Sequence, residues 1–218
     1  MIPLRDSHPT RKKPIITYFL ILVNILVFFW EISGSDFEGF ISQYALIGTK
    51  INFFNFSSLW PFLTFQFIHG GLLHLFSNMW FLKIFGDNVE ERLGSLKFLL
   101  FYLFAGIIAG LSQYVFLINS DIPMIGASGS VAGVLGAYFA FFPGHTIETL
   151  IPSPLFWHKV NLPAAVVLFY WFITQLFAGI ISLPMASLGG VAFFAHAGGF
   201  LGGWLIARRI KNSEGVRF

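Results

Sequence analysis

Long, uninterrupted apolar runs alternate with short polar stretches along the chain. A helix that crosses a bilayer needs about 20 mostly apolar residues. Six runs approach that length, at residues 14–30, 62–85, 98–117, 126–142, 163–183 and 191–207. They are continuous, whereas transmembrane β-strands alternate apolar and polar positions. The pattern predicts an all-α membrane protein: one domain over 14–209 with six transmembrane helices, a short segment 1–13 before it and a tail 210–218 after it.

Composition favours a bilayer over water as the surroundings of this chain. Hydrophobic residues make up 56% of the 218 residues and charged residues only 11%, whereas about a quarter of a soluble domain is charged. The sequence contains no cysteine. Disulfides, thiolate metal sites and a cysteine nucleophile are therefore excluded.

The distribution of charge predicts which loops face the cytoplasm. If residues 1–13 are cytoplasmic, only Lys50 among the 13 lysines and arginines falls on the outer side, as the positive-inside rule requires. The acidic residues expected outside are Glu31, Asp36, Glu38 and Asp121. Both termini are then cytoplasmic. Because topology accounts for the basic residues, we expect no nucleic-acid partner.

A few polar side chains interrupt the apolar runs. They are His69, His74 and Asn78 in the second run, Ser128 and Ser130 in the fourth, Gln175 in the fifth and His196 in the sixth. Polar groups in hydrocarbon are costly and usually functional. The second, fourth and sixth runs cross the membrane in the same direction, and each carries its polar residues near its beginning. The sequence predicts a site at one level, just beneath the outer surface.

Spacing indicates how these side chains meet. His74 and Asn78 are four residues apart, on one helix face. In the sixth run His196 shares a face with Gly199 and Gly203, and the fourth run opens with Gly126 and Gly129 around Ser128. Small residues allow close helix packing. We therefore expect Ser128 to come within hydrogen-bonding distance of His196.

Other interpretations assign some of these residues to structure or to other functions. Ser130 is expected to bond back to a helix carbonyl, His69 to cap a loop end, and Gln175 to form an interhelical hydrogen bond outside the catalytic core. A metal held by the three membrane histidines lacks a carboxylate partner, so we expect none. A transporter is disfavoured because no intramembrane carboxylate or broken helix is visible.

A loop pattern follows the second run. In 86–92, Asp87 or Asn88 is expected to end the helix, and Glu90 to pair with Arg92.

Together the motifs resemble the rhomboid family, in its compact six-helix prokaryotic form. They are His69-x4-His74-x3-Asn78, Gly126-Ala127-Ser128-Gly129 and His196-x2-Gly199-x3-Gly203. The resemblance implies a six-helix rhomboid-like bundle and an intramembrane serine endopeptidase without a cofactor. Ser128 would be the nucleophile and His196 the general base. The side chains of His74 and Asn78, with the backbone N–H of Ser128, would form the oxyanion hole. Its substrates would be transmembrane segments of other proteins, entering laterally from the lipid beside the fifth span.

Two positions depart from the family pattern. Relatives often carry a tyrosine stacked on the histidine where this chain has Ala132, so we expect Phe193 or Phe194 to orient His196 instead. The outer segment 31–62 lacks the Trp-Arg pair of many relatives. The alternative function is a catalytically silent membrane-protein binder of the same fold. The location expected is a bacterial cytoplasmic membrane, because 13 residues are too few for an organelle transit peptide.

Overall fold

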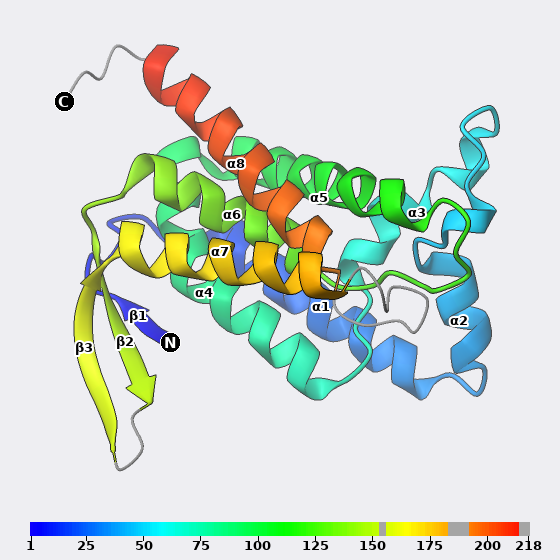
Figure 1. Ribbon diagram of the computed structural model, residues 1–218, viewed down its shortest axis with the longest axis horizontal. Helices are drawn as coiled ribbons and strands as arrows, with labels where there is room; N and C mark the ends of the chain where they lie inside the picture. The colour runs from blue at the N-terminus through cyan, green and yellow to red at the C-terminus, as the bar shows by residue number, and fades with distance from the viewer. Residues whose placement is uncertain (153–155, 183–191, 214–218) are drawn as a thin grey trace.

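Six helices of 14 to 23 residues form the body of the molecule in this computed structural model, which describes residues 1–152, 156–182 and 192–213. They are α1 (Ile15–Ser33), α4 (Leu72–Leu93), α5 (Ser95–Leu117), α6 (Ser128–Phe141), α7 (Ala164–Ser182) and α8 (Phe193–Ser213). The shortest, α6, packs against α4, α5, α7 and α8 and so lies at the centre of the bundle (Figure 1).

Five of the six apolar runs each form one helix, with ends shifted by up to six residues. By length and composition, Ile15–Ser33, Ser95–Leu117 and Ala164–Ile181 qualify as membrane spans. The count of six spans stays a prediction. Residue 183 of the fifth run, residue 191 of the sixth and residues 214–218 of the tail lie outside the described residues.

The second apolar run is broken, contrary to the prediction of one helix over 62–85. It forms the short helix α3 (Pro61–Thr64), the 3-10 turn η3 (Phe65–Phe67), a loop and then α4. The loop contains two consecutive glycines, and Gly71 is fully extended (φ 162°, ψ 164°), which stops helical hydrogen bonding there. His69 consequently lies in a loop, while His74 and Asn78 share the first half of α4.

The first helix is polar on its inner face and apolar on its outer face. Thr17, Asn24 and Glu31 are buried against the bundle, whereas Leu22 and Phe29 are more than half exposed. Lipid surrounding the bundle accounts for both faces, because inward polar groups can find partners and outward apolar groups meet hydrocarbon. Glu31 lies in the last turn of α1, and one of its carboxylate oxygens accepts a hydrogen bond from the backbone N–H of His69 (2.9 Å). That Glu31 faces the outer side of the membrane stays a prediction.

The expected pairing of Glu90 with Arg92 is wrong. The Glu90 carboxylate accepts hydrogen bonds from the N–H groups of Ile16 (2.9 Å) and Thr17 (2.8 Å), and from the hydroxyls of Thr17 (2.9 Å) and Ser95 (2.7 Å). It thereby caps α1, because the first N–H groups of a helix lack partners within the helix and favour a negative charge. The guanidinium of Arg92 lies over the Phe141 ring at 5.5 Å.

The end of α4 also differs from the prediction. The helix continues past Asp87 and Asn88 to Leu93, and the chain turns at Gly94 in a left-handed conformation (φ 81°). A positive φ is easily adopted only by glycine, so Gly94 rather than an Asx residue terminates the helix.

A three-stranded antiparallel sheet departs from the all-α prediction. Strand β1 (Ile2–Asp6) pairs with β2 (Thr146–Pro152), which pairs with β3 (Trp157–Pro163). Alternate β2 residues, Ile147 and Thr149, are buried, which is the period of two expected of a half-covered strand. The sheet and the end of α8 lie at one end of the bundle, and α2 (Phe37–Tyr44) and α3 lie at the other (Figure 1).

The segment 31–62 docks on the bundle without the Trp-Arg pair. Besides α2 it contains the 3-10 turns η1 (Gly48–Lys50) and η2 (Phe56–Ser58). Leu46 and Met124 exchange backbone hydrogen bonds of 3.1 and 2.9 Å, and the Thr64 hydroxyl donates to the Tyr44 carbonyl (2.7 Å). Backbone pairing therefore fixes this segment to the loop that precedes α6.

Candidate active site

Glycines bring α6 and α8 into backbone contact, as their spacing predicted. A Cβ placed on Gly199 would lie 2.2 Å from the carbonyl oxygen of Gly129, and one on Gly203 would lie 2.0 Å from that of Gly133. Real Cβ atoms do not approach so closely, so these positions of α8 accept only glycine while the backbone stays in place. Short side chains on the two helices can therefore touch.

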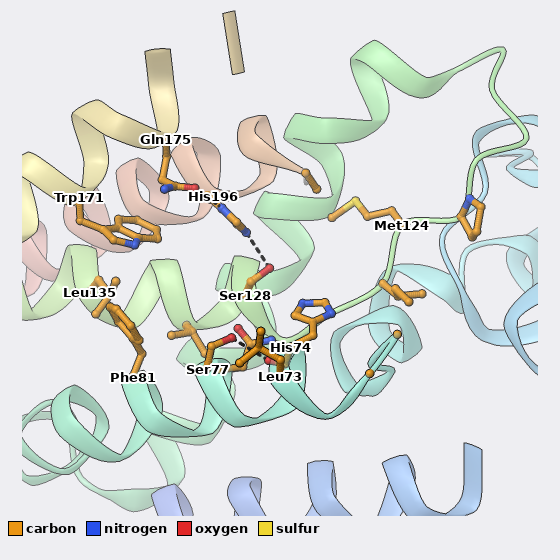
Figure 2. Close-up of a pocket in the computed structure, with 17 residues that line it drawn as sticks. Leu73, His74, Ser77, Phe81, Met124, Ser128, Leu135, Trp171, Gln175 and His196 are labelled. Atoms are coloured by element: carbon orange, nitrogen blue, oxygen red, sulfur yellow. Dashed lines mark hydrogen bonds between the residues drawn. The ribbon is translucent and has the colours of Figure 1, made fainter. Parts of the chain in front are cut away.

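Ser128 and His196 meet where these two helices begin. Ser128 is the first residue of α6, and His196 lies in the first turn of α8. The Ser128 Oγ is 2.7 Å from the His196 Nε2, and Figure 2 shows the two side chains joined across the helix interface. His196 is 92% buried and Ser128 is partly accessible. A hydroxyl that donates to a shielded imidazole is the arrangement in which histidine acts as a general base.

Gln175 of α7 holds the other side of the imidazole. Its Oε1 is 2.7 Å from His196 Nδ1, and Figure 2 shows it behind His196, away from Ser128. An amide oxygen only accepts hydrogen bonds, so Nδ1 carries the proton and Nε2 presents its lone pair to the serine. Gln175 does form an interhelical hydrogen bond as expected, but it contacts the imidazole itself. It takes the orienting place that the sequence assigned to a phenylalanine.

Neither phenylalanine at the start of α8 stacks on His196. The Phe193 ring lies edge-on to the imidazole at 6.4 Å, and Phe194 stacks on Phe116 at 4.0 Å. Trp171 of α7 is nearer to the imidazole, at 5.9 Å and tilted by 34°. The expectation for Phe193 and Phe194 was wrong because Gln175 binds the imidazole, and the Phe194 ring packs on Phe116 instead.

His74 and Asn78 line the same cavity as Ser128 and His196. The Asn78 Nδ2 is buried and has no hydrogen-bond partner among the described residues, so a donor is available inside the cavity. Gly126 has a left-handed conformation (φ 125°), and a Cβ there would lie 2.7 Å from the His74 ring and 3.5 Å from the Ser128 Oγ. The glycine leaves room for the His74 ring to pack beneath the serine.

Ser130 and His69 lie outside this cavity. The Ser130 hydroxyl donates to the Gln66 Oε1 (2.8 Å) rather than to a helix carbonyl, so the expected back-bond is wrong. His69 caps no helix: both of its ring nitrogens are buried without a partner among the described residues, and its ring lies 5.1 Å from that of His74. The sequence did not single out Gln66, because a polar residue beside an aromatic-rich turn carries no periodic signal.

The cavity has a volume of about 820 Å³ and is bounded by α4, α6, α7, α8 and the loop before α6. Phe81 of α4 and Trp171 of α7 lie on opposite sides of it (Figure 2). The cavity therefore extends from Ser128 along the seam between α4 and α7.

Several known proteins are similar to this chain. The Rhomboid protease GluP of Bacillus subtilis is 39% identical over 127 residues, which are 57% of this chain and 24% of that protein. The RHOMBOID-like protein 4 of Arabidopsis thaliana is 33% identical over 147 residues, 67% of this chain and 33% of that protein. The putative rhomboid protease YdcA of Bacillus subtilis is 29% identical over 128 residues, 59% of this chain and 62% of that protein.

The first two of these relatives are much longer than the matched region. The chain covers a third of their length or less. The family model described as Rhomboid domain matches residues 57–212, a stretch that holds α3 to α8 and the whole cavity around Ser128. The match covers well over half of the chain. This integral membrane protein therefore belongs to the rhomboid family.

Proposed function

We propose that the protein is an intramembrane serine endopeptidase in which Ser128 is the nucleophile and His196 the general base. The 2.7 Å contact between Ser128 Oγ and His196 Nε2 is the observation that carries this proposal. Relatives named as rhomboid proteases support the same reaction class. Water and a substrate backbone could both reach the serine, because the hydroxyl borders the cavity.

Acylation begins when His196 Nε2 takes the serine proton while Oγ attacks the scissile carbonyl carbon. The imidazolium that forms is stabilised by its Nδ1–H bond to Gln175 and then returns the proton to the leaving amine. Water, deprotonated by the same imidazole, attacks the acyl-enzyme ester and releases the carboxylate product. The neutral amide of Gln175 orients the imidazole, which is the role that aspartate has in a Ser-His-Asp triad.

Developing negative charge on the carbonyl oxygen needs donors on the side away from His196. Three groups that border the cavity suit it: the Asn78 amide, the His74 imidazole and the backbone N–H of Ser128. The last of these lies at the N-terminus of α6, where N–H groups lack helical partners and the helix dipole is positive. An oxyanion-hole donor of this kind commonly contributes about 10²–10³ in turnover.

Substrates would be transmembrane segments of other membrane proteins, entering from the lipid between α4 and α7. The seam bordered by Phe81 and Trp171 supports this route, since it leads from the bundle surface to Ser128. A substrate helix must unwind near the serine, because helical carbonyls are already hydrogen-bonded. Membrane lipids are then the medium through which every substrate arrives.

We place both termini in the cytoplasm and the active site toward the outer face of a bacterial cytoplasmic membrane. Basic residues support this orientation. Arg5, Arg92, Lys159 and Lys211 all belong to the end of the bundle with the sheet, whereas Lys50 lies at the other end with α2. The positive-inside rule makes the first of these ends cytoplasmic.

Cleavage of a model transmembrane substrate by purified protein in detergent tests the proposal. Wild type is expected to cleave and to react with a fluorophosphonate, and Ser128→Ala to do neither. Ser130→Ala is the matched control, because it removes a hydroxyl two residues away that faces Gln66 instead. Equal cleavage by wild type and Ser128→Ala would refute the mechanism. Substrate binding without cleavage or labelling would favour the silent binder.

A further inference from the structure

A second cluster of polar side chains lies at the far end of α6 from Ser128. Asp6 ends β1, His8 follows two residues later, and His145 lies between α6 and β2. One ligand atom from each of the three lies within 4.8 Å of the other two. Tyr138, which contacts His145 (3.0 Å), is ten residues beyond Ser128 on α6. The cluster is thus about 15 Å along the helix from the active site.

The spacing of these atoms matches a transition-metal site. His8 Nδ1 is 3.3 Å from Asp6 Oδ1, and His145 Nδ1 is 3.7 Å from Asp6 Oδ2. Zinc binds histidine nitrogen and carboxylate oxygen at roughly 2.0–2.2 Å. Ligand atoms at the corners of a tetrahedron of that size are roughly 3.3–3.6 Å apart. The two distances from the Asp6 carboxylate to the imidazoles are therefore close to the separations that one bound ion would impose.

The carboxylate at the centre of the cluster is held from outside. Asn88 Nδ2 donates to Asp6 Oδ2 (2.8 Å) and the Tyr138 hydroxyl donates to the same oxygen. The His8 backbone N–H folds back onto Asp6 Oδ1 (2.8 Å), which brings the two side chains to one side of the chain. Asp6 is 94% buried as a side chain, whereas His8 is 46% exposed. Such outer contacts orient a metal-bound carboxylate and are usual around metal sites.

We propose that Asp6, His8 and His145 form a binding site for Zn²⁺, with water as the fourth ligand. The two imidazoles are stacked 3.9 Å apart and 14° from parallel, and a metal must lie in the plane of each ring that binds it. Binding consequently requires the rings to splay apart. His8, the more exposed of the two, is the ring expected to turn, and its Nδ1 would then give up its contact with the Thr146 N–H (3.4 Å). The sequence concealed this site because His8 and His145 are 137 residues apart (145 − 8).

A bound ion would fasten the N-terminal strand to the junction of α6 and the sheet. That junction precedes α7, one wall of the active-site cavity. The proposal does not depend on the protease assignment, because none of its ligands borders the cavity around Ser128.

Metal binding by the full chain in detergent tests the proposal, with a purification tag free of histidine. The protein is stripped with a chelator and titrated with Zn²⁺ against a chromophoric competitor, and Co²⁺ is used as a spectroscopic probe of tetrahedral geometry. Wild type is expected to bind one Zn²⁺ per chain, and to exclude Mg²⁺ and Ca²⁺ because these ions prefer all-oxygen sites. His8→Ala and His145→Ala are each expected to weaken Zn²⁺ binding at least about a hundredfold, since loss of an outer-shell contact alone weakens it about 10–100-fold.

His158→Ala is the matched control, because His158 is an exposed histidine on β3 of the same sheet, outside the cluster. It is expected to bind Zn²⁺ like wild type. Gel filtration establishes that each variant is folded, and His8→Ala is decisive because that side chain is exposed. The proposal is overturned if wild type binds no Zn²⁺, if His8→Ala binds it as tightly as wild type, or if Mg²⁺ competes equally.

Discussion

Replacement of Gln175 by leucine tests how His196 is oriented. Leucine is similar in size but accepts no hydrogen bond, so Gln175→Leu removes the 2.7 Å contact to His196 Nδ1 and little else. Without it the imidazole can rotate or adopt the other tautomer. The proton on Nδ1 also loses its acceptor at the moment when the ring becomes positively charged.

The size of the effect follows from the charge on the imidazole. A hydrogen bond that involves a charged group contributes about 1.5–3 kcal/mol, whereas a neutral one contributes about 0.5–1.5 kcal/mol. His196 acts as a neutral base in the free enzyme and is charged in the transition state, so kcat/KM loses the difference between the two values, about 1–1.5 kcal/mol. Each 1.36 kcal/mol is tenfold in rate, which gives a decrease of about 5–13-fold in kcat/KM. The expected loss is smaller than the roughly 10⁴-fold recorded for a triad aspartate changed to asparagine, because an amide carries no charge.

The assay measures kcat/KM for a fluorogenic transmembrane substrate in proteoliposomes, with fluorophosphonate labelling as a second readout of serine reactivity. Gln113→Leu is the matched control: its Oε1 accepts the N–H of Ala195 (3.2 Å), the residue before His196, but does not touch the imidazole. Both variants lose one interhelical hydrogen bond to α8. Unchanged kcat/KM in Gln175→Leu, or an equal loss in Gln113→Leu, would show that Gln175 does not orient the base.

Three further outcomes follow from the structure. Gly199→Ala should destabilise the bundle by about 1–3 kcal/mol or more through backbone overpacking and lower the unfolding temperature in detergent, while Gly144→Ala, with open space around it, should not. Asn78→Ala should lower kcat about 10²–10³-fold without lowering that temperature, and a full rate would exclude it from the oxyanion hole. The hydrogen bond from Arg5 lowers the pKa of Glu148. The stabilising contact between Arg5 and Glu148 is therefore fully present above the ordinary carboxyl pKa, and it is lost as pH falls through the lowered pKa of Glu148. In Arg5→Ala the NMR titration of Glu148 should therefore move to higher pH.

Features with a period along the chain could be predicted from the sequence. Uninterrupted apolar runs specify helices, and glycines three and four residues apart specify the close contact of α6 and α8. The shared direction of three runs placed Ser128 and His196 at one level. Because α6 and α8 are in backbone contact, the side chains of Ser128 and His196 can come within 2.7 Å of each other.

What the sequence could not predict depends on partners far along the chain. Gln175 reaches His196 only because α7 packs against α8, and nothing in its neighbourhood distinguishes it from an ordinary interhelical donor. Glu90 lies two residues from Arg92, but the free N–H groups at the start of α1 attract its carboxylate more strongly. The loop at Gly70 and Gly71 interrupts an apolar run that composition alone would continue.

The position of β1 imposes an order on assembly. Ile2 pairs with Leu150, and at about 5–20 residues per second a ribosome needs roughly 7–30 s to make the chain between them. The polar face of α1, with Thr17, Asn24 and Glu31, is left uncovered for only part of that interval, because α4 and its Glu90 are made before β2. The cap on α1 can therefore form before β1 can join the sheet, so β1 is made early in the chain but fixed late.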